Sequence, residues 1–231
     1  MNNKNNKNTI KKWCCDDKIH SFFVNAVKAH LSIIVCGAPG TGKTDLVKYM
    51  TKYIPANERA TIIENNPEIE YSNINPDKEC IEIQINDSMD YDTAIKLSMK
   101  QLSKWLIMDE IRGREVVNFL KSLSTGMSGI TTLHTDSVKK APERIKNMST
   151  DVNENDIFNL IDVIVQVKSV IKKNQEIKHY ISELALLYHN VDTGENETVM
   201  LYDNEKFLDA ELPSDIEIKF KEAGITNLFQ I

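Results

Sequence analysis

Residues Leu31–Met50 read LSIIVCGAPGTGKTDLVKYM. The apolar run Leu31–Cys36 predicts a buried strand, and Asp45–Met50 is typical of a helix. Between them, Gly37–Thr44 matches the pattern Gly-x-x-x-x-Gly-Lys-Thr. A glycine loop between a strand and a helix surrounds phosphate groups with backbone N–H groups, and the helix N-terminus favours their negative charge. The segment therefore predicts a phosphate-binding loop for a nucleoside triphosphate.

This loop supplies the candidate nucleotide-binding residues. They are Gly37, Ala38, Pro39, Gly40, Thr41, Gly42, Lys43 and Thr44. Lys43 would direct a positive charge at the β- and γ-phosphates, and the Thr44 hydroxyl would bind Mg²⁺. We therefore expect ATP and Mg²⁺ as cofactors. The alternative is a plain strand-turn-helix without a ligand.

Strand and helix patterns alternate through the first two thirds of the chain. Apolar residues at helical spacing predict a helix over 19–30 beside the first strand. Further strands are predicted over 60–64, 80–85, 104–108 and 129–133, and helices over 92–102 and 111–122. Such alternation requires a mostly parallel sheet with helices on both faces. The predicted fold class is therefore α/β, and the Gly37–Thr44 loop makes it a P-loop NTPase.

The last third of the chain has a different pattern. Residues 161–170 and 177–187 predict a hairpin or neighbouring strands, followed by a strand over 198–202 and a helix over 215–222. We predict one ATPase domain over 18–231, in which 151–231 form a small C-terminal α/β extension. Residues 1–17 would form a tail, disordered at its Asn/Lys-rich start.

The composition narrows the choice of partners and compartment. The 231 residues carry a net charge of −6, which argues against broad nucleic-acid binding. No stretch approaches the roughly 18 to 20 apolar residues of a membrane span, and the start lacks the apolar core of a signal peptide. The cysteines show neither a zinc spacing nor a disulfide framework. The sequence predicts a cytoplasmic protein with reduced thiols that binds no nucleic acid.

A second nucleotide motif lies at Trp105–Glu110, an apolar strand that ends in two carboxylates. P-loop enzymes place acids at this edge of the sheet, beside Mg²⁺ and the γ-phosphate. Glu110 is the candidate base that orients the attacking water, and Asp109 is a candidate for the Mg²⁺ shell. The alternative is that both acids only begin the next helix, where they favour its dipole.

Two further side chains follow predicted strands. Glu64 comes at the end of the strand over 60–64 and would polarise the water or bind metal. The alternative is a solvated strand-end acid. His134 follows the strand over 129–133, where it would sense the γ-phosphate, although a lone histidine is more often structural.

These motifs resemble a known family. Segment 106–115, LIMDEIRGRE, and segment 123–135, LSTGMSGITTLHT, closely resemble the Walker B region and the His box of the type II/type IV secretion and conjugation ATPases, which include the pilus-assembly motors. Arg59–Glu68 resembles the acidic Asp box of that family, and Pro142–Ile145 and Ile161–Val167 also match it. The resemblance covers about residues 20–225. It implies a RecA-like fold, a hexameric ring and roles around the nucleotide for Glu64, Glu68, Glu110, Arg112 and His134.

The chain also departs from the family pattern. Only Met1–His30 precede the first core strand, so we expect the family's large N-terminal domain to be absent. Asn65 and Met127 stand where the family has aspartate and histidine. The arginines are Arg59, Arg112, Arg114 and Arg144. Lysine cannot reproduce the bidentate phosphate clamp of an arginine, so hydrolysis by the isolated chain should be slow.

We interpret the sequence as an ATP-hydrolysing motor subunit for secretion, conjugation or pilus assembly. It would form a homo-oligomeric ring or assemble with a full-length ATPase, at the inner face of the cell membrane beside membrane-embedded secretion or pilus components. One alternative is a nucleotide-binding regulator that hydrolyses little, which Asn65, Met127 and the few arginines favour. The other is an AAA-like DNA-associated ATPase, which Ala38–Thr41 suggests and the acidic balance opposes.

Overall fold

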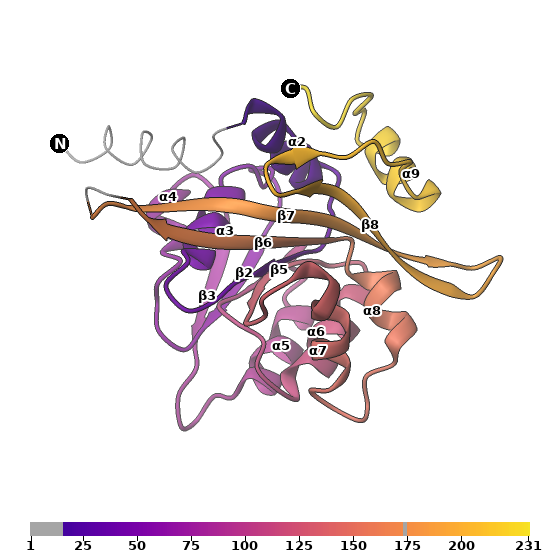
Figure 1. Cartoon of the computed structure of the whole chain (residues 1–231). Helices are drawn as coiled ribbons and strands as arrows, with labels where there is room; N and C mark the ends of the chain where they lie inside the picture. The colour runs from indigo at the N-terminus through magenta and orange to yellow at the C-terminus, as the bar shows by residue number, and fades with distance from the viewer. Residues whose placement is uncertain (1–15, 173–174) are drawn as a thin grey trace.

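The computed structural model describes residues 16–172 and 175–231, arranged as Figure 1 shows. Most of the predicted N-terminal tail lies outside these ranges, so its predicted disorder stays a prediction. Its last two residues are described: Asp16 is the N-cap and Asp17 the first residue of helix α2 (Asp17–Lys28). The Asp16 carboxylate accepts a hydrogen bond from the Lys18 backbone N–H at 2.8 Å and caps this helix.

One twisted sheet runs through the described residues, in the strand order β3-β2-β4-β5-β1-β6-β7-β8-β9. Neighbours from β3 to β6 in this order pair in parallel, and β7, β8 and β9 continue the sheet antiparallel. The strands are β1 (Ile33–Cys36), β2 (Ala60–Glu64), β3 (Cys80–Gln84), β4 (Trp105–Met108), β5 (Ser128–Leu133), β6 (Val163–Ile171), β7 (Ile177–Asn190), β8 (Glu195–Asp203) and β9 (Lys206–Phe207). The predicted α/β class with a mostly parallel sheet is confirmed.

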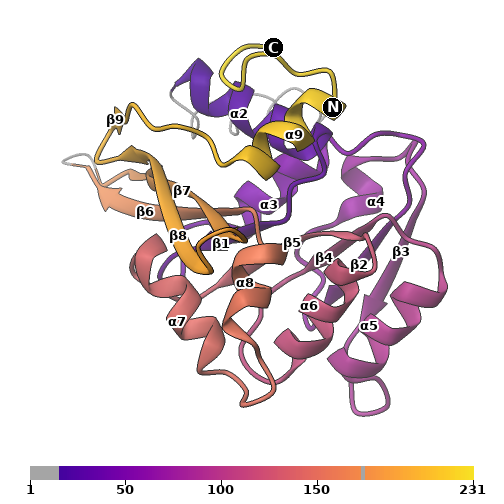
Figure 2. The same ribbon diagram turned by 90° about the vertical axis from the view of Figure 1, so that its right-hand side faces the viewer.

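Helices cover both faces of this sheet (Figure 2). One face is packed by α2, α3 (Lys43–Thr51), α4 (Tyr71–Ile74) and α9 (Ser214–Glu222). The other is packed by α5 (Tyr91–Lys100), α6 (Glu115–Ser124), the 3₁₀ turn η1 (Val138–Lys140), α7 (Ala141–Lys146) and α8 (Glu154–Leu160). Each parallel strand therefore feeds two cores: Ile33 and Val35 of β1 face one, and Ile34 and Cys36 the other. This two-sided burial explains why β1 and β4 read as unbroken apolar runs, whereas in the edge strand β3 apolar residues alternate with exposed polar residues.

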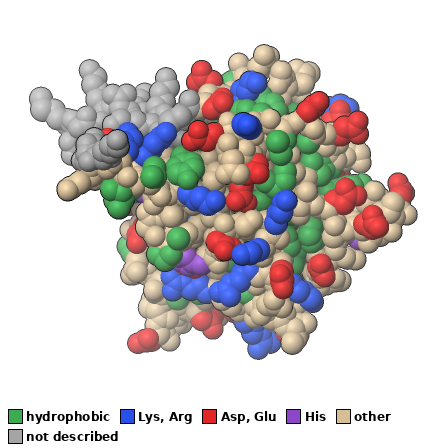
Figure 3. Space-filling model, in the orientation of Figure 1, with side chains coloured by type: hydrophobic (Ala, Val, Ile, Leu, Met, Phe, Trp, Pro, Cys, Tyr) green, Lys and Arg blue, Asp and Glu red, His purple; other side chains and the backbone are tan. Residues whose placement is uncertain are grey.

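The last third of the chain extends the sheet instead of forming a separate layer. Strands β6 and β7 pair antiparallel, so the predicted hairpin is confirmed. The turn from β7 to β8 forms the right-hand tip of the molecule in Figure 1, and acidic side chains gather at this side in Figure 3. The exposed acids of the turn and the start of β8 are Asp192, Glu195 and Glu197. Elsewhere on that face, acidic and basic side chains are interspersed.

Several boundaries differ from the sequence prediction. The helix predicted over 111–122 begins only at Glu115, because Gly113 and Arg114 form a turn before it. At this turn, Glu115 Oε1 accepts hydrogen bonds from the backbone N–H groups of Arg112 and Gly113, at 2.5 and 2.9 Å. The short helices α4, α7 and α8 were not predicted, since segments of four to seven residues are too short to show a helical period.

Close packing of α6 on β5 depends on Gly129. A Cβ at this position would lie 2.6 Å from Phe119 Cζ and 2.8 Å from Leu123 Cδ2. We expect Gly129→Ala to lower the free energy of unfolding by about 1–3 kcal/mol, because these buried rings and methyls must move. Urea denaturation would measure the change. Gly113→Ala is the matched control, since its Cβ would meet only Glu115 Oε2, at 3.5 Å; equal stability loss in both variants would refute the packing argument.

Candidate functional site

The phosphate-binding loop lies where the sequence places it, between β1 and α3. Gly40 and Gly42 have positive φ angles of 73° and 85°, and Gly42 is the N-cap of α3. No side chain caps this helix, so its first N–H groups remain available for an anion. The loop is tightened by Thr41, whose hydroxyl donates to the Ala38 carbonyl at 2.8 Å.

Lys43 occupies the interior of the loop. Its Nζ donates to the Ala38 carbonyl at 3.1 Å and lies 3.4 Å from His134 Nδ1. Burial lowers the pKa of Lys43, and the nearby Glu110 carboxylate partly opposes this shift. The ammonium is thus held at the loop by weak partners that phosphate oxygens would replace.

Glu110 stands at the centre of a charged cluster beside the loop. Its side chain is largely buried, with Oε2 2.8 Å from Arg112 and Oε1 3.0 Å from His134 Nε2. Since a carboxylate only accepts, His134 Nε2 carries a hydrogen, which leaves Nδ1 to accept from Lys43 in the neutral ring. The structure therefore brings together four predicted residues in a continuous chain: Lys43, His134, Glu110 and Arg112.

Asp109 points to a different set of partners. Both of its oxygens accept from the Tyr91 hydroxyl, at 2.8 and 3.1 Å, and Oδ2 also accepts from the Asn65 backbone N–H at 2.8 Å. Burial raises the pKa of Tyr91, and the Asp109 charge adds to this shift. The sequence did not single out Tyr91, because a tyrosine in the first turn of a helix carries no functional signal of its own.

Glu64 lies at the carboxyl end of β2, as predicted. Its Oε1 accepts from the backbone N–H groups of Glu68 and Ile69, at 3.0 and 2.8 Å. Burial raises the pKa of Glu64, and these two hydrogen bonds oppose the shift. The contacts show that Glu64 fixes the loop that follows β2, at the same sheet edge as the Gly37–Thr44 loop.

An open cavity of about 600 Å³ adjoins the loop, within the usual range for ligand sites. Its lining comprises Gly40, Gly42, Lys43, Thr44, Asp45, Lys48, Glu68, Glu70 and His179. The predicted Mg²⁺ ligand Thr44 thus faces the cavity. Hydroxyl and carboxylate oxygens suit Mg²⁺, which needs few protein ligands when phosphates complete its shell. The Thr44 hydroxyl therefore fits the predicted ion, whereas Asp109 does not line this cavity and its oxygens accept from Tyr91 and Asn65.

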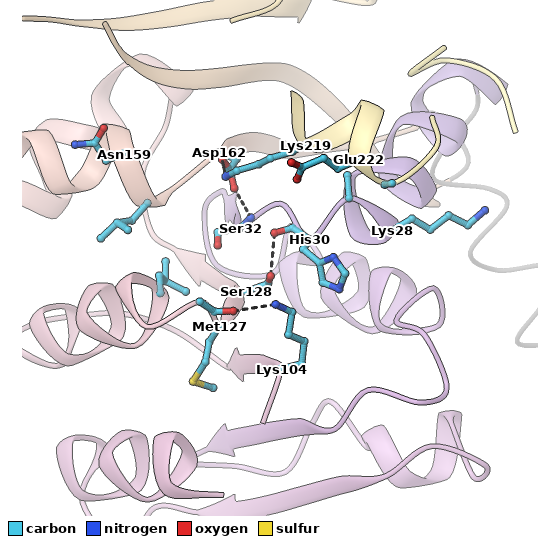
Figure 4. Close-up of a pocket in the computed structure, with 15 residues that line it drawn as sticks. Lys28, His30, Ser32, Lys104, Met127, Ser128, Asn159, Asp162, Lys219 and Glu222 are labelled. Carbon is cyan, nitrogen blue, oxygen red and sulfur yellow. Dashed lines mark hydrogen bonds and ion pairs between the residues drawn. The ribbon is translucent and has the colours of Figure 1, made fainter. Parts of the chain in front are cut away.

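A second cavity, of about 410 Å³, lies at the opposite edge of the sheet (Figure 4). Here the buried Asp162 pairs with Lys219 at 2.5 Å and accepts from the Ser32 backbone N–H at 2.8 Å. Burial raises the pKa of Asp162, which the Lys219 charge opposes. Lys104 donates to the Gly126 carbonyl at 3.0 Å. Asp162, Lys219 and Lys104 are therefore already paired within the protein. Among the residues that line this second cavity, no glycine loop precedes a helix N-terminus, so we place the candidate site at the P-loop edge.

Comparison with known proteins agrees with this fold. The family described as Type II/IV secretion system protein matches residues 1–202. Curated relatives include a Bacillus anthracis protein, pXO2-25, 25% identical over 82% of this chain and 46% of its own length. Another is the type IV secretion system protein VirB11 of Bartonella quintana, 26% identical over 65% of this chain and 46% of its own length. The chain spans about half the length of these relatives.

Among solved structures, the VirB11 ATPase of the Brucella suis type IV secretion system aligns with a TM-score of 0.64 and 23% identity, over 72% of this chain and 51% of that one. This likeness shows the fold. Within residues 16–172 and 175–231, none of the helices combines the length and apolar character that a bilayer crossing needs. The family match extends over most of the sequence and includes the loop, both acidic strand ends and the His box. The chain therefore belongs to the Type II/IV secretion system protein family.

Proposed function

We propose that this chain binds ATP with Mg²⁺ at the Gly37–Thr44 loop and hydrolyses it, as a motor subunit of a secretion, conjugation or pilus-assembly system. The observation that carries the proposal is the cluster of Glu110, Arg112 and His134 against Lys43, at the same sheet edge as the loop. Strand ends that serve only the fold do not require a buried acid (Glu110), two cations (Lys43 and Arg112) and a histidine (His134) next to a helix without a side-chain cap. A Mg²⁺-dependent ATPase assay of the purified protein tests it.

In this proposal, the loop amides and Lys43 bind the phosphates. Thr44 and Asp109 would hold Mg²⁺, which supplies positive charge to the phosphate oxygens. Glu64 fixes the adjoining loop through Glu68 and Ile69. The residues that surround the γ-phosphate thus come from three strand ends and the P-loop.

Glu110 would orient the water that attacks the γ-phosphate and accept its proton. In the present arrangement both of its oxygens are engaged, by Arg112 and His134. The Arg112 side chain is 76% exposed and is thus able to swing toward a bound γ-phosphate, which would free Glu110 Oε2. His134 would remain as the link between Glu110 and Lys43.

Arg112 is the one arginine at this cluster among the described residues. Arg59 pairs with Glu79, and Arg114 lies 3.6 Å from Asp151. The proposed site therefore has little charge to stabilise the transition state from within one subunit, and an arginine from a neighbour would supply it. A ring of identical subunits, or co-assembly with a longer ATPase at the inner face of the membrane, would bring such a neighbour.

We expect the isolated protein to hydrolyse ATP slowly, at a rate well below roughly 1 s⁻¹, with specific activity that rises with protein concentration. An arginine supplied in trans is worth about 10³ to 10⁵ in rate in comparable NTPases. Specific activity over a hundredfold concentration range, with particle size measured in parallel, checks this. Rapid turnover by a proven monomer would rule out the assembly argument.

A nucleotide-binding regulator is the second candidate. The contacts of Glu110 with Arg112 and His134 favour it, because a carboxylate with both oxygens bound by the protein is not free to orient a water molecule. Tight ATP binding without turnover, at any concentration and with any partner, would establish the regulator and reject the motor.

A further inference from the structure

Strands β6 and β7 pass the phosphate-binding loop and continue beyond it. Strand β6 pairs with β1 as far as Cys36, opposite Gln166, and then runs on to Ile171 in register with β7. A Cβ on Gly37 would lie only 2.6 Å from the Val167 carbonyl oxygen, so the loop starts in close contact with this hairpin. Figure 1 shows the hairpin extending to the left past α3.

His179 is a residue of β7 whose side chain contacts the phosphate-binding loop. It lies opposite Ser169 in the hairpin and lines the cavity next to Lys43 and Thr44. Its Nδ1 lies 2.7 Å from the backbone carbonyl oxygen of Thr41. Because a carbonyl oxygen only accepts, Nδ1 must carry the hydrogen.

This hydrogen bond fixes one peptide group of the loop. The Thr41 carbonyl and the Gly42 N–H belong to the same planar trans peptide, so they point in opposite directions. Thr41 lies between two glycines with positive φ, where rotation of the peptide meets little steric resistance. With its carbonyl held by β7, the peptide presents the Gly42 N–H to the opposite side. A rotated peptide would instead direct its oxygen toward the phosphates and repel them.

We propose that His179 is a positioning residue of the nucleotide site, which holds the Thr41–Gly42 peptide in the orientation that binds phosphate. The inference rests on the proposed ATP binding and adds a residue 138 positions from the loop that it orients. His179 acts through the backbone and does not take part in the chemistry.

The test compares three variants by calorimetric titration with ADP. His179→Leu removes the donor, His179→Asn keeps an N–H group near the position of Nδ1, and His189→Leu is the matched control. His189 lies on the same strand, and its Nδ1 is 2.6 Å from Asn196 Oδ1, away from the loop. We expect ADP to bind about fivefold to tenfold more weakly to His179→Leu, the equivalent of one neutral hydrogen bond. His179→Asn and His189→Leu should stay within about twofold of wild type.

The position of the hydrogen on the His179 ring provides a second test, by NMR of the wild-type protein. The His179 variants serve only to assign the ring signal. The long-range ¹H–¹⁵N spectrum of the wild-type protein should show a hydrogen on His179 Nδ1. A bare Nδ1 would overturn the inference, as would equal ADP affinity of His179→Leu and wild type, or an Asn variant as weak as the Leu variant. If folded wild-type protein binds no ADP, the proposed function fails and this inference with it. If wild type binds but the Leu variant is unchanged, only the inference fails.

Discussion

Lys43→Ala should weaken ATP binding by about 100-fold or more. The substitution removes the side-chain charge that the loop directs at the β- and γ-phosphates, and each hydrogen bond to a charged group contributes about 1.5–3 kcal/mol. Among residues 16–172 and 175–231, the hydrogen-bond partners of its Nζ are the Ala38 carbonyl and the His134 ring, which phosphate oxygens would replace. Titration with a fluorescent ATP analogue measures the effect.

Lys48→Ala provides the matched control. This lysine belongs to the same helix and lines the same cavity, but its Nζ donates to the Glu68 carbonyl at 2.8 Å and pairs with Glu70 at 3.1 Å. Because Lys48 is already engaged on the protein, we expect its loss to change ATP affinity by no more than about threefold. Binding by Lys43→Ala within about twofold of wild type would show that the loop is not the site.

Glu110→Gln should retain ATP affinity but reduce turnover by about 100-fold or more. The amide fills the same space and keeps an acceptor for His134, yet it cannot take the proton of the attacking water. It also loses the ion pair with Arg112, which releases that guanidinium without restoring a base. Single-turnover hydrolysis and equilibrium ATP binding, measured on the same preparation, separate the two effects.

Glu64→Gln is the comparison that assigns the base. Its carbonyl oxygen would still accept from the Glu68 and Ile69 N–H groups, so the loop after β2 should stay in place and turnover should fall much less. An equal loss in Glu64→Gln, with no effect in Glu110→Gln, would move the base to the end of β2 and contradict our assignment.

The local sequence was sufficient for the parallel half of the fold and for the location of the site. Apolar runs mark β1, β2, β4 and β5, and glycine spacing marks the loop. Since the carboxyl ends of parallel strands meet at one edge, Glu64, Glu110 and His134 had to follow β2, β4 and β5 at the same edge as the loop. These placements depend only on residue type and order along the chain.

Tertiary structure alone decided which partners these side chains have. Asp109 and Glu110 are adjacent, yet one is bound by Tyr91 and Asn65 and the other by Arg112 and His134. The antiparallel course of β7 brings His179 to the loop, although no local pattern distinguishes it from any other strand histidine. Contacts between residues far apart in sequence depend on strand register and on the packing of whole elements, and neither is encoded in the spacing of nearby residues.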